Sequence, residues 1–438
     1  MERLLMDDLL KWKNRNRKKP LIIHGARQVG KTWLMKEFGK RYYKKTVYIN
    51  FENNERMQML FEGNLEPRRL IEALQIESGM QIDPENSLLI FDEIQEVPRA
   101  LTSLKYFCEE APGFSIVAAG SLLGMALHQG TSFPVGKVDF LNLYPLNFRE
   151  FLAARGEQGL VDLLNSDDRQ MQAVFHNKFT DYLRQYYFIG GMPEAVLTYV
   201  ETHDYDEVRR IQKNLLTYYE NDFSKHAPAD QIPRIQMVWN SIPSQLAKEN
   251  RKFIYGMVRE GARAKDFELA IQWLSDYGLI CRSTRITKPA IPLTAYMEMN
   301  AFKLFMLDIG LLTAKGEIGA RTLLEGNRIF TEFKGALTEQ FVAQELAASG
   351  IKLYYYSAAN SRGEIDFVVQ QEDRIYPVEV KAEENLKAKS LKAFCERYAP
   401  LHGIRTSMSN YREEAWMTNV PLYQIADFLK AGSHNQYA

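Results

Sequence analysis

The decisive stretch of this 438-residue sequence is Gly25-Ala26-Arg27-Gln28-Val29-Gly30-Lys31-Thr32. It fits the pattern G-x-x-x-x-G-K-[ST] at every position, with an apolar run before it and a helical pattern from Lys31 to Gly39 after it. A strand, a glycine-rich loop and a helix in this order form a loop whose backbone amides face anionic oxygens. The sequence therefore predicts that these residues bind the phosphates of ATP.

Two side chains of this loop are expected to have separate roles. Lys31 is predicted to bridge the β- and γ-phosphates, and the hydroxyl of Thr32 to bind Mg²⁺. A glycine-rich turn without a ligand is the alternative. The strand before the loop and the helix after it argue against that alternative.

A second motif completes the predicted site at Leu88-Leu89-Ile90-Phe91-Asp92-Glu93. An apolar strand that ends in two carboxylates places charge where a core strand alone does not need it. Asp92 is predicted to hold Mg²⁺ through water, and Glu93 to orient the attacking water. The alternative is that the two acids only begin a helix.

Further strands are expected at residues 20–25, 47–51 and 114–119, with helical patterns between them. This alternation predicts an α/β fold, a P-loop NTPase parallel sheet with helices on both faces. Ser121 follows the last of these strands. It either senses the γ-phosphate as a third catalytic residue beside Lys31 and Glu93, or caps the next helix.

Composition bounds the remaining possibilities. The length predicts several domains, and 55 basic against 55 acidic residues mean that any nucleic-acid contact must come from a local patch. The three cysteines, Cys108, Cys281 and Cys395, fit neither a disulfide framework nor a zinc pattern. No signal peptide or bilayer-spanning apolar run is found, so we expect a cytoplasmic protein without a membrane partner.

Three regions are predicted after an ATPase domain at residues 1–155. Residues 156–235 are expected to be helical, residues 236–298 to form a winged helix-turn-helix, and residues 299–425 a small α/β domain. Within the last, a helix is predicted at 331–348 and strands at 351–356, 363–370 and 374–381.

The C-terminal region carries acids at positions that suggest a metal site. Glu379 and Lys381 share one face of a strand, Asp366 lies on the preceding strand, and Glu339 shares a helix face with apolar residues. Glu339, Asp366 and Glu379 with Lys381 are therefore candidates for binding divalent ions, in the layout of a PD-(D/E)xK nuclease, which this region resembles. An inactive nuclease-like fold and ordinary charged faces are the alternatives.

A modest excess of basic residues lies between Lys248 and Lys288. A recognition helix near residues 265–276 with a basic wing suits contacts to a DNA backbone. A packing module with a solvated face is an equally weighted alternative.

The whole chain resembles prokaryotic predicted AAA+ superfamily ATPases that end in a domain of unknown function. The resemblance is carried by the loop and its preceding strand and by three further motifs, Tyr144-Pro145-Leu146-Asn147-Phe148-Arg149-Glu150-Phe151, Gly190-Gly191-Met192-Pro193-Glu194-Ala195, and Arg362–Phe367 with Pro377–Lys381. It implies an AAA ATPase core, a helical segment, a winged helix and a nuclease-like end. The family commonly has an arginine where this chain has Lys137, and Arg149 and Arg184 are candidates for an arginine finger.

Two hypotheses of function follow. The first is a Mg²⁺-dependent ATPase that engages DNA, with a C-terminal domain that cuts or grips it. The second is a regulatory ATPase whose C-terminal domains bind protein partners without cleavage. A nucleotide-binding scaffold without turnover is disfavoured by Glu93.

Overall fold

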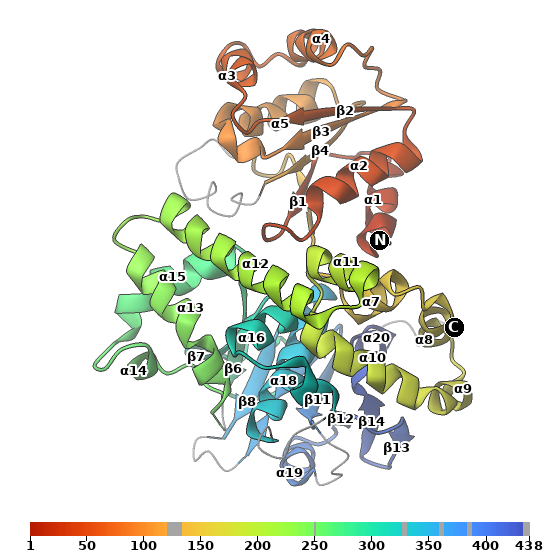
Figure 1. Ribbon diagram of the computed structural model, residues 1–438, viewed down its shortest axis with the longest axis vertical. Coiled ribbons are helices and arrows are strands. Elements are labelled where there is room, and N and C mark those ends of the chain that lie inside the picture. The colour runs from red at the N-terminus through yellow and green to blue at the C-terminus, as the bar shows by residue number, and fades with distance from the viewer. Residues whose placement is uncertain (121–133, 249–250, 326–330, 359–362, 383–387, 432–438) are drawn as a thin grey trace. The chain divides into compact units, whose positions relative to one another are not determined.

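The computed structural model describes residues 1–120, 134–248, 251–325, 331–358, 363–382 and 388–431 (Figure 1). These residues form two compact units. The first consists of Met1–Tyr144 with Asp276–Gly278, and the second of Pro145–Ser275 with Leu279–Ala438. Each unit is described by itself below.

The first unit contains a five-stranded sheet in the order β2-β3-β4-β1-β5, and every neighbouring pair is parallel. The strands are β1 (Leu21–His24), β2 (Lys45–Asn50), β3 (Ser87–Asp92), β4 (Ser115–Ala119) and β5 (Asp139–Asn142). The helices are α1 (Leu5–Lys13), α2 (Lys31–Tyr42), α3 (Glu55–Glu62), α4 (Pro67–Ser78), η1 (Ile94–Glu96) and α5 (Pro98–Glu110). The predicted parallel sheet is therefore confirmed.

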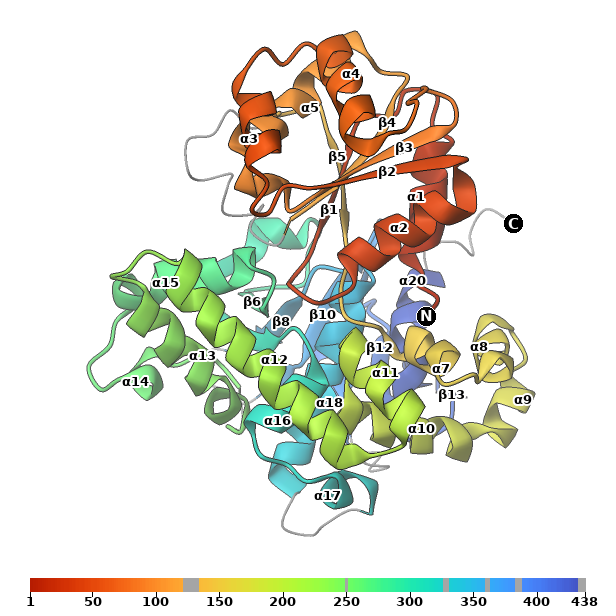
Figure 2. The same cartoon turned by 45° about the horizontal axis from the view of Figure 1, so that its top comes forward.

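Both faces of this sheet are covered by helices (Figure 2). Val47, Ile49, Leu89 and Phe91 belong to one buried cluster with apolar side chains of α3, α4 and α5. Because side chains alternate along a strand, the intervening positions such as Ile90, which is also buried, face α1 and α2. This double burial explains why the strands are continuous apolar runs.

The edge strand β5 is the element that the sequence does not predict. Its residues Asp139, Phe140, Leu141 and Asn142 are only half-buried or exposed, and Phe140 is 49% exposed. An edge strand needs no apolar run, because one flank and part of its faces meet solvent.

The second unit begins with helices, as predicted. They are α7 (Phe148–Ala154), α8 (Gln158–Asn165), α9 (Arg169–Val174), α10 (His176–Ile189), α11 (Pro193–Thr202), α12 (Tyr205–His226), α13 (Ile232–Leu246), α14 (Tyr255–Val258) and α15 (Ala264–Asp276). Later helical elements are η2 (Leu293–Tyr296), α16 (Ile309–Lys315), α17 (Ala320–Leu324), α18 (Thr331–Ala348), α19 (Lys389–Arg397), η4 (Leu422–Gln424) and α20 (Ile425–Ala431).

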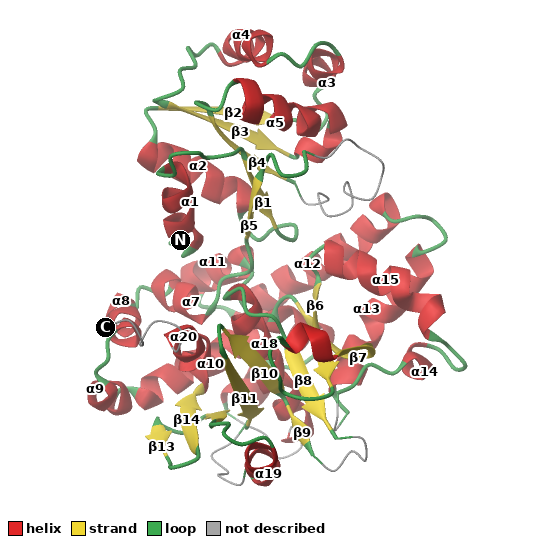
Figure 3. Ribbon diagram, turned by 180° about the vertical axis from the view of Figure 1, so that it is seen from behind, coloured by secondary structure: helices red, strands yellow, loops and turns green. Residues whose placement is uncertain are grey.

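Two sheets follow these helices (Figure 3). One has the order β7-β6-β8-β9 and the other β10-β11-β12-β14-β13. Their strands are β6 (Ile280–Ile286), β7 (Met297–Met306), β8 (Tyr354–Ser357), β9 (Glu364–Ile365), β10 (Phe367–Gln371), β11 (Arg374–Val380), β12 (Gly403–Ser407), β13 (Arg412–Glu413) and β14 (Met417–Pro421).

The sheet that contains the strands of the predicted winged helix extends beyond this segment of the chain. Helices α13 to α15 are followed by the antiparallel pair β6 and β7, which is the element order expected of a winged helix. However, β6 also pairs in parallel with β8, which lies in the predicted C-terminal domain. One sheet thus joins residues on both sides of the predicted boundary at 298.

Two of the sequence motifs meet inside the second unit. Asn147 and Glu150 form a capping box at the start of α7. The amide of Leu146 donates to the carbonyl of Gly191 (2.7 Å), and the amide of Gly191 donates to Oδ2 of Asp308 (2.6 Å). A Cβ on Gly191 would lie 2.0 Å from the Leu146 carbonyl oxygen, so this close approach requires glycine. These motif residues are therefore structural.

Glu345 is a buried acid that ties α18 to α7. Its Oε1 accepts the amide of Phe148 (2.9 Å). Burial raises the pKa of the Glu345 carboxyl to about 8, with further increases from Asp427 and Glu150, while the Phe148 amide and Arg149 oppose the shift. The folded protein thus favours the neutral form of Glu345.

Among the described residues, none of the helices has both the length and the apolar character needed to cross a lipid bilayer.

Glu345 makes the stability of the second unit depend on pH. A carboxyl whose pKa is raised on folding contributes stability that is complete below its unfolded pKa and is lost as the pH rises through about 8. In the wild type, the Glu345 carboxyl should lower the free energy of unfolding as the pH rises from about 5 to about 9. Replacing Glu345 by glutamine should make this decrease smaller by about 1 to 4 kcal/mol. Denaturant unfolding at both pH values measures this, with Glu201→Gln on the exposed end of α11 as the control. Equal pH dependence in wild type and Glu345→Gln would contradict the prediction.

Candidate nucleotide-binding site

The loop between β1 and α2 has the backbone that the glycine pattern predicts. Gly25, Gln28 and Gly30 have φ values of 152°, 64° and 96°, which are positive values that L side chains rarely adopt. A Cβ on Gly25 would lie 2.2 Å from the carbonyl oxygen of Leu143. The loop is therefore wrapped tightly around the N-terminus of α2, where backbone amides and the helix dipole favour an anion.

Lys31 occupies the interior of this loop. Its buried ammonium donates to the carbonyls of Gly25 (2.8 Å) and Ala26 (2.7 Å). Burial lowers the pKa of Lys31 to about 8, against the opposing effect of Glu93 and Asp92. An anion in the loop would favour the charged form, so the group is suited to bind phosphate.

Asp92 connects the two halves of the predicted site. Its Oδ2 accepts the hydroxyl of Thr32 (2.7 Å) and the hydroxyl of Tyr48 (3.0 Å). Asp92 is buried at the end of β3, so these hydrogen bonds fix its orientation. Carboxylate and hydroxyl oxygens side by side are ligands that suit Mg²⁺, directly or through water. The residues present thus fit a Mg²⁺–nucleotide complex.

Glu93 directly follows β3 in a left-handed backbone conformation, with φ 51° and ψ 42°. A non-glycine residue in this region costs about 1 kcal/mol or more, and such residues concentrate at functional sites. The Glu93 side chain accepts a hydrogen bond from Gln95 (2.7 Å). Gln95 therefore holds the carboxylate that is the predicted base.

The other candidates for the ATP site are Ser121, Arg149, Arg184 and the residue at the family's arginine position, Lys137. Ser121 lies outside the described residues. In the second unit, Arg149 pairs with Asp427 (2.9 Å) and Arg184 with Asp181 (2.9 Å). Lys137 pairs with Glu109 (2.8 Å). The arginine-finger role of Arg149 and Arg184 stays a prediction.

Family models match three parts of the chain. Residues 17–152 match the model of an AAA domain. The N-terminal unit has the P-loop NTPase fold. Residues 180–322 and 334–425 match two domains of unknown function, DUF8612 and DUF4143. The predicted AAA-type ATP-binding core and the C-terminal domain of unknown function are thereby confirmed, whereas the nuclease-like end stays a prediction.

Solved structures show a distant likeness over most of the chain. A Walker-type ATPase of Pyrococcus abyssi is 15% identical with a TM-score of 0.46, over 72% of this chain and 95% of that chain. The Aeropyrum pernix ORC1 protein in complex with DNA is 13% identical with a TM-score of 0.27, over 72% and 90%. Drosophila ORC bound to DNA is 12% identical with a TM-score of 0.25, over 73% and 94%. No curated protein matches the chain.

The C-terminal acids Glu339 and Asp366 come together in the second unit. Their side chains are hydrogen-bonded, and the repulsion between the two carboxylates together with burial raises the pKa of Asp366 well above its usual value. Oδ2 of Asp366 accepts the amide of Val380 (2.7 Å). This hydrogen bond links the residue between β9 and β10 to the end of β11. Asp366 therefore favours its protonated form beside an ionised Glu339.

Two cations neutralise the carboxylate of Glu339. The ammonium of Lys303 on β7, which is 0% exposed, lies 3.4 Å from Glu339 Oε2 and 2.5 Å from Glu364 Oε1. Arg251 forms an ion pair with the other oxygen of Glu339. These cations hold the pKa of Glu339 below its usual value despite burial, and the carboxylates in turn raise the pKa of Lys303. The internal ammonium of Lys303 thus lies between Glu339 and Glu364.

Glu379 and Lys381 pair with each other at 2.8 Å. Among the described residues, no group of three or more His, Cys, Asp or Glu side chains is arranged to hold a metal ion. As described, Glu339, Asp366 and Glu379 therefore do not fit a divalent ion. Nuclease activity stays a prediction without support from this geometry.

Sequence reasoning missed Tyr48, Gln95 and Lys303. Tyr48 and Gln95 have ordinary surroundings in the sequence, and only the fold places them beside Asp92 and Glu93. Lys303 had a signal, because it is a lone charge within the apolar run from Ala301 to Met306.

The buried ammonium of Lys303 yields a prediction about stability and metals. Lys303→Met leaves Glu339 and Glu364 with less neutralising charge, and breaking a buried ion pair costs about 3 to 5 kcal/mol. We expect this loss in denaturant unfolding, but not in Lys392→Met, which changes an exposed lysine of α19.

We also expect Mg²⁺ and Mn²⁺ to leave the wild-type melting temperature unchanged without nucleotide. Metal stabilisation that disappears in Asp366→Ala would restore the metal-site hypothesis.

Proposed function

We propose that this protein is an ATPase that binds ATP with Mg²⁺ at the loop before α2 and hydrolyses it. The observation that carries the proposal is the 2.7 Å hydrogen bond from Thr32 to Asp92, which joins the two motifs at one edge of the parallel sheet. When bound, Mg²⁺ would neutralise charge on the phosphates. Thr32 and Asp92 would hold the ion, and the amides from Gly25 to Lys31 would surround the phosphates.

Each protein group then has a defined task. The ammonium of Lys31 leaves the carbonyls of Gly25 and Ala26 and pairs with phosphate oxygens. Glu93 accepts a hydrogen bond from the attacking water and directs it at the γ-phosphate. Tyr48 and Gln95 are positioning residues, because they hold Asp92 and Glu93 respectively.

A second proposal concerns the region after the AAA domain, which we infer grips DNA without cutting it. Its support is the exposed basic group at the start of α15, formed by Arg259, Arg263 and Lys265. Guanidinium and ammonium groups near a helix N-terminus suit phosphate contacts. The neutralised acids at Lys303 argue against cleavage. Binding of a protein partner is the alternative outcome.

Lys31 and Glu93 separate binding from turnover. Lys31→Ala should abolish tight ATP binding in calorimetry with Mg²⁺, because the phosphates lose their buried charge partner. Glu93→Gln should keep ATP bound yet slow phosphate release about a hundredfold or more, because the water loses its base. The exposed substitution Lys392→Met serves as the control. Near-normal affinity in Lys31→Ala would refute the site, and unchanged turnover in Glu93→Gln would place the base elsewhere.

DNA binding is tested on the basic group of α15. The double variant Arg263→Gln/Lys265→Gln should weaken duplex binding about tenfold and lower the salt slope by about two, whatever the base sequence. Fluorescence anisotropy at several salt concentrations measures both. The matched control is Arg210→Gln/Lys213→Gln, two exposed basic residues of α12. Equal losses in both double variants, or no binding by the wild type, would favour the protein-partner alternative.

A further inference from the structure

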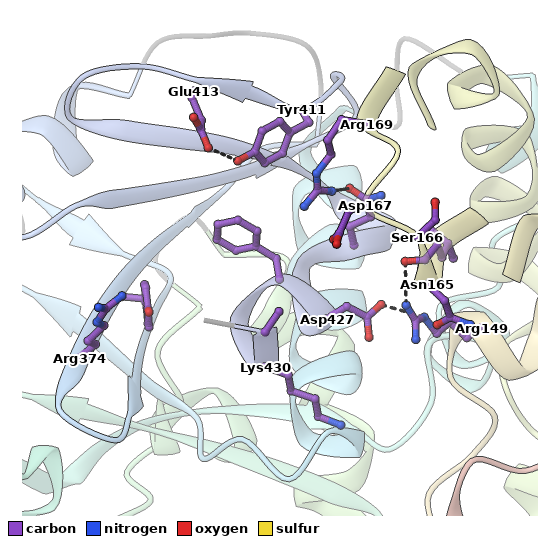
Figure 4. Close-up of a pocket in the computed structure, with 15 residues that line it drawn as sticks. Arg149, Asn165, Ser166, Asp167, Arg169, Arg374, Tyr411, Glu413, Asp427 and Lys430 are labelled. Carbon is purple, nitrogen blue, oxygen red and sulfur yellow. Dashed lines mark hydrogen bonds and ion pairs between the residues drawn. The ribbon is translucent and has the colours of Figure 1, made fainter. Parts of the chain in front are cut away.

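The second unit holds a cavity that neither the ATP site nor the acidic cluster uses (Figure 4). Its volume is about 640 Å³, within the range of small-molecule sites. The walls come from the helical segment α7 to α9, from the start of β11, from β13 and from α20. Arg374 and Tyr376 line it from β11, and period two puts them on the strand face opposite Glu379 and Lys381.

Basic residues outnumber acidic residues in the lining of this cavity. Four basic residues line it: Arg149, Arg169, Arg374 and Lys430. The acids that line it are Asp167, Glu413 and Asp427. Asp427 is occupied by Arg149 at 2.9 Å, and Glu413 accepts the hydroxyl of Tyr411.

Two of these guanidinium groups have no carboxylate partner among the described residues. Arg169 donates to the side-chain oxygens of Gln424 (3.0 Å) and Gln172 (3.2 Å), which are neutral. Arg374 is exposed at the start of β11 and forms no ion pair with the described part of the chain. A guanidinium group without a carboxylate partner at a concave wall suits the oxygens of a phosphate.

Aromatic rings lie beside these charges. The guanidinium of Arg169 lies 4.4 Å from the centre of the Tyr411 ring. The Tyr411 and Phe428 rings are 6.3 Å apart at 52°, and Tyr376 adds a third ring to the lining. Partly exposed aromatic faces beside arginine suit a flat heterocycle, because stacking and cation–π attraction then act together.

We propose that this cavity binds a nucleoside monophosphate, independently of the P-loop. Arg169 holds the phosphate, Tyr411 and Phe428 contact the base, and the exposed carboxylate of Asp167 accepts a sugar hydroxyl. Arg374, which lies across the cavity from Arg169 (Figure 4), donates to the edge of the base. A half-enclosed space of this size fits a single nucleotide, and the ion pair of Arg149 with Asp427 forms one of its walls.

The test uses the full chain with Lys31→Ala, in which the P-loop no longer competes for nucleotide. Calorimetry with AMP and GMP should show binding in the micromolar range, with adenosine and inorganic phosphate each binding at least about tenfold more weakly. Arg374→Gln and Arg169→Gln should each weaken AMP or GMP binding about tenfold. Arg374 forms no ion pair within the described ranges of the chain, so its replacement breaks none of the ion pairs seen there and the test stays interpretable. Arg234→Gln, which changes a partly exposed arginine of α13, is the matched control.

The outcomes separate this proposal from the ATPase. AMP or GMP binding that depends on Arg374 and Arg169 supports the cavity, even if ATP hydrolysis by the wild type is absent. Binding that is equal in Arg374→Gln, Arg169→Gln and Arg234→Gln overturns it, as does the absence of AMP and GMP binding below millimolar concentrations. Binding of a single-stranded oligonucleotide without mononucleotide binding also overturns it.

Discussion

The parallel direction of all five strands is the constraint on which the N-terminal unit depends. Because the strands run the same way, their carboxyl ends meet at one edge, and β1 and β3 deliver their loops there with only β4 between them. Thr32 and Asp92, which are far apart in the sequence, can therefore share a hydrogen bond. The burial of both sheet faces in turn keeps this edge rigid.

Buried acidic and basic side chains connect the elements of the second unit. Asp308 and Glu345 accept backbone amides, and Lys303 and Arg251 neutralise Glu339. Each group would be costly alone, because a buried charge or polar atom without a partner loses its hydration. The motifs around Leu146 and Gly191 serve this internal network. These motifs therefore have a structural role in the second unit.

The sequence predicted most where the deciding pattern is local. The strands of the first sheet other than β5, the helix Thr331–Ala348 and the two nucleotide-binding motifs all rest on runs of neighbouring residues. The edge strand β5 escaped prediction because its exposed side chains do not need an apolar pattern. Tyr48 and Lys303 escaped it because their partners lie on other elements. Lys303, which pairs with Glu339 and Glu364, was not foreseen beside the C-terminal acids.

The parallel pairing of β6 with β8 has a consequence for how this chain can be divided. Thr284, Arg285 and Ile286 lie in register with Tyr354, Tyr355 and Tyr356, so a cut at residue 298 would separate partners within one ladder. Each fragment would present an unpaired strand edge, which is an adhesive surface for other chains. A division of the chain that leaves this ladder intact must therefore keep β6 and β8 in one piece, although the sequence alone predicts a boundary between them.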